Sequence, residues 1–282
     1  MDIVITAALG YEHTVILPFM QSLRKVYQGR VACLISPEQL NEIKNFANHF
    51  SIDLVIAEGS QTGNPACDRF FIYKKYLDSN KDLTRVFLTD SRDVIFQASP
   101  FVNELPHLYL FSEPKNIQDC QANSSWVRHI YGDDALAKLS NFPILCSGTT
   151  LGSYDLIRNY LNNMCEEMSL LQNLNEPLVW GTDQTVHMYL YYSGKLPSAT
   201  IRKHGFSEVQ TLHHETNFIF DKECFLLNLD LKKVHVIHQY DRHNQSFHRC
   251  SIDSNASFIC YFNFLKKFRI FSHEMSEVRL IT

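Results

Sequence analysis

Two carboxylates three residues apart, Asp90 and Asp93, lie between the apolar runs 86–88 and 94–96. Short apolar runs of this kind are typical of strands buried on both faces of a sheet. The carboxyl end of such a strand is where open α/β sheets bind ligands. Two carboxylates on one short turn suit a hard divalent cation, which often carries phosphate oxygens as its other ligands. The alternative is a solvated turn in which Arg92 pairs with one aspartate.

Other apolar runs also end in residues suited to a binding site. Ser147 and Gly148 follow residues 142–146, and the glycines within 147–153 allow close approach of a ligand to the backbone. The alternative is that residues 147–153 form an ordinary turn, which would have the same composition. The first apolar run ends in small residues that leave room for a planar ligand: Thr6, Ala7 and Ala8.

The elements that position these residues alternate between strand and helix. We expect strands at 2–8, 31–35 and 54–57, and helices at 13–26 and 36–50, the second with Ser36 as N-cap and Pro37 in its first turn. This alternation predicts an α/β fold with a parallel, doubly wound central sheet.

The next part of the chain continues this pattern. A loop at 59–65 precedes an expected helix at 66–77, which carries Arg69 and Lys74; five residues apart, these two do not share one helix face. Residues 108–111 predict a strand. The polar stretch 112–126 is the best candidate for a mobile loop. Further helices are expected at 154–172 and from residue 180 onward, the latter capped by Thr182 or Asp183.

The last third changes character to short strands, expected at 209–212, 217–220, 225–227 and 234–237. We find no repeat and no clear linker. The simplest organisation is one continuous domain over 1–243 with a β-rich C-terminal part, followed by an extension at 244–282.

Composition excludes several classes of protein. The net charge of -4 and the pI near 6.3 argue against a general nucleic-acid binder. None of the eight cysteines forms a C-x-x-C pair, which argues against a zinc site of the usual spacing. The sequence has no apolar run long enough to span a membrane and no signal-peptide pattern at its start. Together with the thiols, this favours a reducing cytosol.

In four motifs the chain resembles GT-A-fold nucleotide-sugar glycosyltransferases. Residues 86–94, Val-Phe-Leu-Thr-Asp-Ser-Arg-Asp-Val, resemble their aspartate metal motif, with the D-x-x-D form of collagen glycosyltransferase domains. Residues 146–153, Cys-Ser-Gly-Thr-Thr-Leu-Gly-Ser, resemble the N-S-G-x-x-L-G segment of glycogenin-like and bacterial galactosyltransferase-like enzymes. Residues 181–184, Gly-Thr-Asp-Gln, resemble their D-Q element. Residues 236–239, Val-Ile-His-Gln, lie where those families carry a metal-binding histidine.

The resemblance implies a nucleotide-sugar-binding part over about 1–97, an acceptor-side part over about 98–243, and a role for each motif. Asp90, Asp93 and His238 would hold the metal, and His238 is preferred over His235 and His243. Asp183 and Gln184 would lie at the reacting centre, with retention preferred over inversion. Donor contacts are expected from a wider set: Thr6, Ala7, Ala8, Arg69, Lys74, Asp90, Ser91, Arg92, Ser147 and Gly148. For Arg92 the alternative is simple neutralisation of the two aspartates.

The implied activity is transfer of a sugar, UDP-linked by preference, to a glycan or lipid-linked glycan, as in polysaccharide biosynthesis. Mn²⁺ is preferred as cofactor, with Mg²⁺ the alternative, because a mixed carboxylate and imidazole set is softer than Mg²⁺ favours. The metal would stabilise the charge that develops on the diphosphate leaving group.

The chain departs from the family pattern at two places. Cys146 replaces the usual asparagine, and the glycine and lysine that normally follow the metal histidine are not recognisable after His238, where Arg242 is a candidate substitute. These departures motivate the alternative of a non-catalytic GT-A-like module that binds a nucleotide or glycan. A nucleotidyltransferase fits less well, since the loop after the first strand has one glycine and no basic residue.

Residues 258–271 combine aromatic and basic side chains at helical spacing. Such a helix either docks reversibly at a membrane surface or packs on the core of the domain. The first alternative would place the protein peripherally at the inner face of a membrane.

Overall fold

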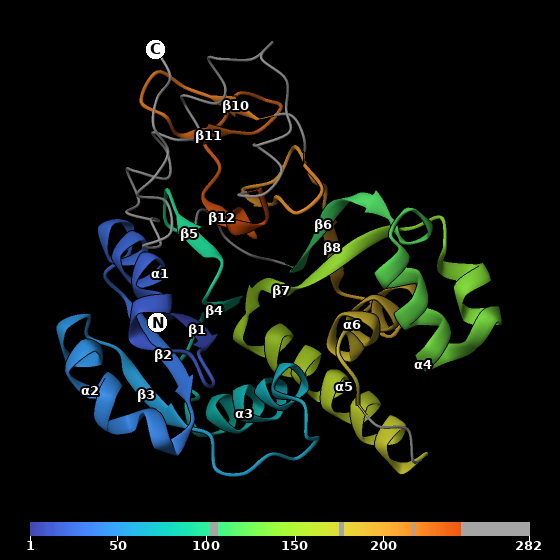
Figure 1. The fold of residues 1–282 in the computed structure, drawn as a ribbon, viewed down its shortest axis with the longest axis horizontal. Helices are drawn as coiled ribbons and strands as arrows, with labels where there is room; N and C mark the ends of the chain where they lie inside the picture. The colour runs from blue at the N-terminus through green and yellow to red at the C-terminus, as the bar shows by residue number, and fades with distance from the viewer. Residues whose placement is uncertain (102–106, 175–177, 216–217, 244–282) are drawn as a thin grey trace, which may run out of the picture.

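A computed structural model describes residues 1–101, 107–174, 178–215 and 218–243. Its centre is a seven-stranded sheet in the order β3-β2-β1-β4-β7-β6-β8, and β7 is the one strand that runs against the other six (Figure 1). The chain is therefore α/β with a mostly parallel sheet, as expected. The strands of this sheet are β1 (Asp2–Ala7), β2 (Arg30–Ile35), β3 (Asp53–Ile56), β4 (Arg85–Asp90), β6 (Leu108–Asn116), β7 (Pro143–Ser153) and β8 (Ala199–Arg202).

Alternate residues of the central strands face two separate apolar layers. In β1, Ile3 and Ile5 pack on one side with α3 (Pro65–Ser79) and α5 (Tyr154–Asn173). Val4 packs on the other side with α1 (His13–Val26). The sheet is thus covered on both faces, which explains why its strands read as continuous apolar runs rather than as alternating ones.

The remaining helices are η1 (Pro37–Gln39), α2 (Leu40–His49), η2 (Ile117–Asp119), α4 (Gln121–Leu139), α6 (Thr182–Tyr192) and η3 (Tyr240–His243). Helix α3 begins at Pro65, one residue before the expected start. Asn64 caps the helix by accepting a hydrogen bond from the backbone of Ala66, and Pro65 occupies the first turn. The Asn64 amide also donates to the carbonyls of Leu178 and Val179, which ties the start of α3 to the segment leading into α6.

A second sheet connects distant parts of the chain. It has the order β5-β12-β9, formed by β5 (Val94–Phe96), β12 (Val236–His238) and β9 (Val209–Thr211). A separate two-stranded sheet joins β10 (Ile219–Phe220) to β11 (Leu226–Leu227). The expected β-rich C-terminal part is confirmed, with strands shorter than the sequence indicated.

The prediction of a mobile loop at 112–126 was wrong. β6 continues to Asn116, and η2 and the start of α4 follow at once. The polar composition has another cause, because Ser112, Glu113 and Asn123 are buried and contact other parts of the chain. Ser112 accepts from the His204 backbone, and Asn123 accepts from the Gln184 amide. The sequence analysis also missed α4, whose helical backbone is interrupted at Gly132.

Two further expectations need correction. Residues 147–153 are not a turn but the second half of β7. Neither Thr182 nor Asp183 caps α6, because the N-cap is Gly181 in the left-handed region at φ 86° and both residues lie in the first helical turn. Asp183 therefore stays free of a capping contact and directs its carboxylate elsewhere.

The extension at 244–282, with the amphipathic stretch 258–271, lies outside the described residues. Among the helices that the structure does describe, none is both long and apolar enough to cross a bilayer.

Candidate metal centre

Asp90 and Asp93 bracket the exit of β4 from the central sheet. Asp90 is the last residue of β4 and pairs with Ala7 of β1. The hydroxyl of Ser91, which is 1% exposed, donates to the Ala7 carbonyl at 2.7 Å and fixes the turn against the end of β1. Asp93 follows this turn and is buried, whereas the side chain of Asp90 keeps 29% of its surface exposed. The two carboxylates therefore lie at the carboxyl edge of the sheet, as the sequence predicted.

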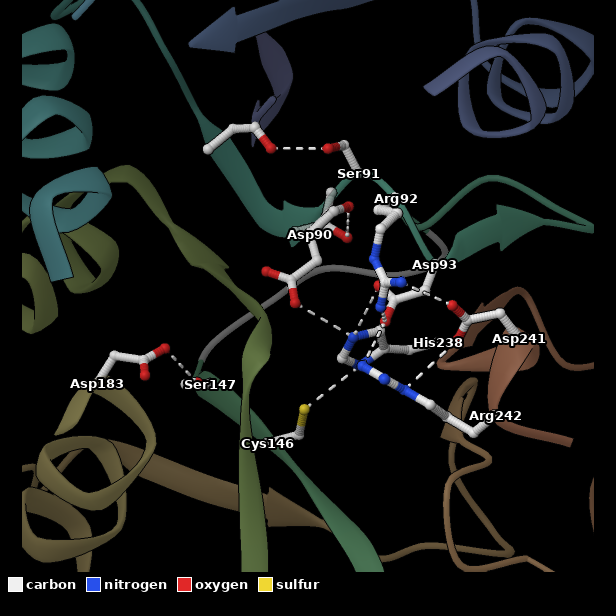
Figure 2. A network of polar contacts seen from close by, with 12 residues as sticks. Asp90, Ser91, Arg92, Asp93, Cys146, Ser147, Asp183, His238, Asp241 and Arg242 are labelled. Carbon is white, nitrogen blue, oxygen red and sulfur yellow. Dashed lines mark hydrogen bonds and ion pairs between the residues drawn. The ribbon is translucent and has the colours of Figure 1, made fainter. Parts of the chain in front are cut away.

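His238 reaches these carboxylates through strand pairing. β12 runs antiparallel to β5, with His238 opposite Val94, the residue after Asp93. The backbone N–H of Gln239 donates to the Asp93 carbonyl at 2.7 Å and extends the ladder by one bond. Backbone register alone thus brings the imidazole beside the aspartates (Figure 2).

The donor atoms of these three residues suit a cation. His238 Nε2 lies 3.3 Å from Asp90 Oδ2 and 3.6 Å from Asp93 Oδ1. Adjacent ligands around an octahedral ion with bonds near 2.1 Å are about 3 Å apart, so little movement is needed to enclose one. Nε2 is buried and makes no well-directed hydrogen bond to any described residue. A buried nitrogen without a hydrogen bond, facing two carboxylates, fits a metal site.

The charges of the three groups support one another. Burial would raise the pKa of Asp90, but the Arg69 guanidinium and His238 outweigh it and the pKa is lowered. Burial likewise opposes the charged form of Asp93, yet His238 lowers its pKa overall. Burial would lower the pKa of His238, whereas Cys146 and the two aspartates raise it well above its usual value. Both carboxylates are therefore ionised at neutral pH.

Strand β7 forms an irregularity where it passes the site. In β6, Leu110 pairs with Thr150 of β7, and Ser112 pairs with Leu145. Between these two pairs, the single residue Phe111 lies opposite the four β7 residues 146–149. Such a bulge re-aims side chains and is common beside active sites. Here it presents Cys146 to the His238 imidazole and Ser147 to the Asp183 carboxylate, as the close view shows (Figure 2).

Gly148 is required by close packing rather than by backbone conformation. A Cβ atom added there would lie 2.5 Å from His238 Cε1 and 2.6 Å from Asp90 Oδ2. Both distances are below any ordinary contact, so only glycine permits Asp90 and His238 to approach each other across β7.

A second buried carboxylate joins the cluster through Arg69. One terminal nitrogen of Arg69 contacts Asp90, and the other lies 2.9 Å from Asp183 Oδ2. The Ser147 hydroxyl donates to the same Asp183 oxygen at 2.9 Å. Asp183 is 7% exposed, and burying a carboxylate is tolerated because a guanidinium and a hydroxyl both bind it. The structure thus brings together Arg69, Asp90, Ser147 and Asp183.

Two arginines flank Asp93 on its outer side. Arg92 Nη2 lies 3.1 Å from Asp93 and its Nη1 3.0 Å from Asp241, and Arg242 Nη2 lies 3.3 Å from Asp93. In this state Arg92 neutralises Asp93 but does not contact Asp90, which is one of the two alternatives raised above. The side chains of Arg92 and Arg242 are both more than one-third exposed, so each guanidinium group reaches Asp93 from the solvent side.

Other candidates lie away from this cluster. Lys74 pairs with Asp78 one turn along α3 and is not brought to the site. Gln184 donates to Asn123 of α4 at 2.8 Å. His235 contacts the Ser99 carbonyl, and the side chain of His243 lies outside the described residues. Thr6 and Ala8 are fully buried, so Ala7 is the member of that set with exposed surface beside Asp90.

Sequence reasoning missed Asp241 and Glu113. Asp241 follows His238 closely, and a count of charges in the segment 238–243 would have drawn attention to it. Glu113 is 4% exposed and adjoins Cys146, but no sequence signal separates it from the polar stretch around it. Only the bulge in β7 brings it to this place.

No protein-family model matches the chain, and no curated protein matches it either.

Proposed function

We propose that this chain is a metal-dependent glycosyltransferase of the GT-A type, which transfers a sugar from a nucleotide sugar to a glycan or lipid-linked glycan. The observation that carries the proposal is the double contact of Arg69. It connects Asp90, a residue of the cation-binding group, to Asp183, the carboxylate assigned to the reacting centre. A diphosphate at the cation and a sugar at Asp183 would then be adjacent.

The residues divide into three roles. Asp90, Asp93 and His238 would hold Mn²⁺ or Mg²⁺, which when bound supplies Lewis-acid stabilisation of the diphosphate leaving group. Asp183, oriented by Arg69 and Ser147, contacts the sugar being transferred and the acceptor. Ala7 keeps some exposed surface beside Asp90, and Gly148 lets Asp90 and His238 approach each other. Retention remains our preference on the strength of the resemblance, and the anomeric configuration of the product, read by NMR, tests it.

Arg92 and Arg242 supply the charge that the family takes from a lysine after the metal histidine. Both now bind Asp93, and a cation would compete with them for that carboxylate. Once displaced, two exposed guanidinium groups beside the cation match the geometry of phosphate oxygens. We therefore assign both to the diphosphate of a UDP-linked donor.

Thermal unfolding with Mn²⁺ and UDP tests this function. Together they should raise the melting temperature of the wild-type protein, since a ligand at 100 times its dissociation constant adds about 2.7 kcal/mol to the stability of the folded state. Neither alone should give the full shift. Asp93→Asn should abolish the joint shift. Asp78→Asn, which also removes an ion-paired aspartate but outside the site, should retain it.

Unchanged Mn²⁺-dependent UDP binding in Asp93→Asn would refute the site assignment. A panel of nucleotide sugars, screened for the same Mn²⁺-dependent stabilisation, then identifies the donor, and the loss of that donor in the presence of glycans measures transfer.

One observation favours a non-catalytic binding module as the second candidate. The four carboxylates Asp90, Asp93, Asp183 and Asp241 already meet three guanidinium groups and an imidazole. The cluster is thus neutralised by the protein itself. Slow, Mn²⁺-dependent hydrolysis of a UDP-sugar separates the two candidates, because a binding module gives none.

A further inference from the structure

A thiol lies behind the imidazole of the metal centre. Cys146 Sγ is 3.3 Å from His238 Nδ1, and both residues are 1% exposed. Nδ1 and Nε2 are on opposite sides of the ring, and Nε2 is the nitrogen that faces Asp90 and Asp93. The sulfur therefore cannot ligate the same cation as Nε2. It is placed instead to control the other ring nitrogen (Figure 2).

A buried carboxyl group adjoins the same thiol. Glu113 of β6 is 4% exposed, and its carboxyl interacts with the Cys146 side chain. His214 Nε2 lies 4.0 Å from Oε2 of the Glu113 carboxylate. Burial raises the pKa of Glu113 to about 7, against the opposing influences of His238 and Cys146.

We propose that Cys146 and Glu113 are positioning residues that keep the proton of His238 on Nδ1 and leave the lone pair of Nε2 for the cation. The Cys146 S–H donates to the Glu113 carboxyl, so the sulfur lone pairs accept from Nδ1–H. Without Glu113 the thiol proton is available to Nδ1, which would favour the opposite tautomer. This inference rests on the proposed function only in identifying His238 as a metal ligand.

The physical reason lies in how histidine binds metals. A ligating nitrogen must be unprotonated, and the hydrogen bond made by the other ring nitrogen decides which one that is. In this chain the usual amide of the resembling families is replaced by a cysteine, whose thiol can either accept or donate. A second group must therefore decide whether the thiol donates to Nδ1 or accepts from it, and Glu113 is the group that interacts with the thiol.

Mn²⁺ affinity, measured from the electron paramagnetic resonance signal of free Mn²⁺, tests the proposal with matched variants. Cys146→Ala should weaken binding 10- to 100-fold, the usual loss on removing such an outer partner. Cys146→Ser should restore most of it. Glu113→Leu should weaken binding, whereas Glu113→Gln, whose amide oxygen still accepts, should not. Cys33→Ala controls for loss of a buried thiol, because Cys33 is also 1% exposed but lies in the core.

A purely structural role predicts a different pattern. All the variants would then lose melting temperature while their Mn²⁺ affinity stayed equal to that of the Cys33→Ala control, and this result would overturn the proposal.

NMR of the His238 ring gives a reading that does not require Mn²⁺, provided that it is recorded above the raised pKa of this ring, where only one of the two nitrogens carries a proton. In the wild type, Nδ1 should carry a proton hydrogen-bonded to sulfur, and this signature should disappear in Cys146→Ala. An unprotonated Nδ1 in the wild type contradicts the inference. If wild-type protein binds no Mn²⁺ yet shows the Nδ1–H signature, the proposed function fails while the hydrogen-bond arrangement stands.

Discussion

His238 lies directly opposite Val94 in the antiparallel pair of β12 and β5. Because Val94 follows Asp93, the register of this pair fixes the distance between the imidazole and the carboxylates. The candidate metal centre is therefore built from two sheets, with Asp90 at the end of the central sheet and His238 in the three-stranded one. Changes that alter how these sheets approach each other should act on cation binding first.

Gly148→Ala should abolish Mn²⁺ binding without unfolding the protein. The added Cβ would lie 2.5 Å from His238 Cε1 and 2.6 Å from Asp90 Oδ2, so the two ligands must separate. Isothermal titration with Mn²⁺ measures the effect. Gly152→Ala is the control on the same strand, where the nearest neighbour is the flexible Ile157 side chain at 3.3 Å. Equal Mn²⁺ affinity in the two variants would mean that Asp90 and His238 do not share an ion.

Arg92→Ala and Arg242→Ala should change the affinities for Mn²⁺ and UDP in opposite directions. Each removes a cation that competes for Asp93, so binding of Mn²⁺ alone should strengthen. Binding of UDP in saturating Mn²⁺ should weaken about tenfold, equivalent to one charge-assisted hydrogen bond.

Equilibrium titrations with Mn²⁺ alone, and with UDP in saturating Mn²⁺, measure the two affinities of Arg92→Ala and Arg242→Ala. Arg128→Ala, which removes an exposed arginine paired with Asp133, provides the baseline. Weaker Mn²⁺ binding in Arg92→Ala would show that the arginine supports the cation rather than competing with it.

Asp183→Asn should separate binding from transfer. The amide preserves the shape of the side chain but removes the charge that Arg69 and Ser147 hold in place. We expect the rate of sugar transfer to fall about 100-fold, the usual cost of one preorganised polar group at a reacting centre. The joint Mn²⁺ and UDP shift in melting temperature should persist.

Gln184→Ala should cost less transfer activity, because this amide is engaged with Asn123 of α4. A larger loss in Gln184→Ala than in Asp183→Asn would reverse the assignment of the two roles.

His187 should make the folded state sensitive to acid. It is fully buried, and burial lowers its pKa to about 3, while the Tyr160 hydroxyl lies 2.7 Å from its Nδ1. Below the ordinary pKa of about 6.5 the unfolded chain takes up a proton that the folded protein does not. The free energy of unfolding therefore decreases as pH falls from about 6.5 toward 3, by up to ~1.4 kcal/mol per pH unit from this group.

Urea denaturation of wild type and His187→Gln between pH 7 and pH 5 isolates that contribution. Glutamine can still accept from Tyr160 and does not ionise, so the variant should lose less stability over this range. Parallel curves for the two proteins would contradict a neutral His187 in the folded state.

Much of the fold follows from local patterns. Continuous apolar runs at β1, β2 and β4 predicted strands buried on both faces, and their alternation with helices predicted the parallel sheet. The prediction of a loop at 112–126 was wrong because its polar residues are buried by contacts with distant parts of the chain. Ser112, Glu113 and Asn123 resemble loop residues in the sequence, yet all three are buried and contact polar groups from distant parts of the chain. Local pattern cannot distinguish polar residues that face water from polar residues that face one another.

The sequence by itself determined the chemistry available to this protein: two carboxylates at a strand end, a later aspartate and a late histidine. Those assignments depend on residue types and on the nearest few neighbours. Only the tertiary structure decided which groups meet. Strand register set His238 against Asp93, a bulge turned Cys146 toward the imidazole, and Arg69 rather than Lys74 entered the site. These are contacts between residues far apart in the chain, and they exist only because packing of the two sheets and their helices brings the strand ends together.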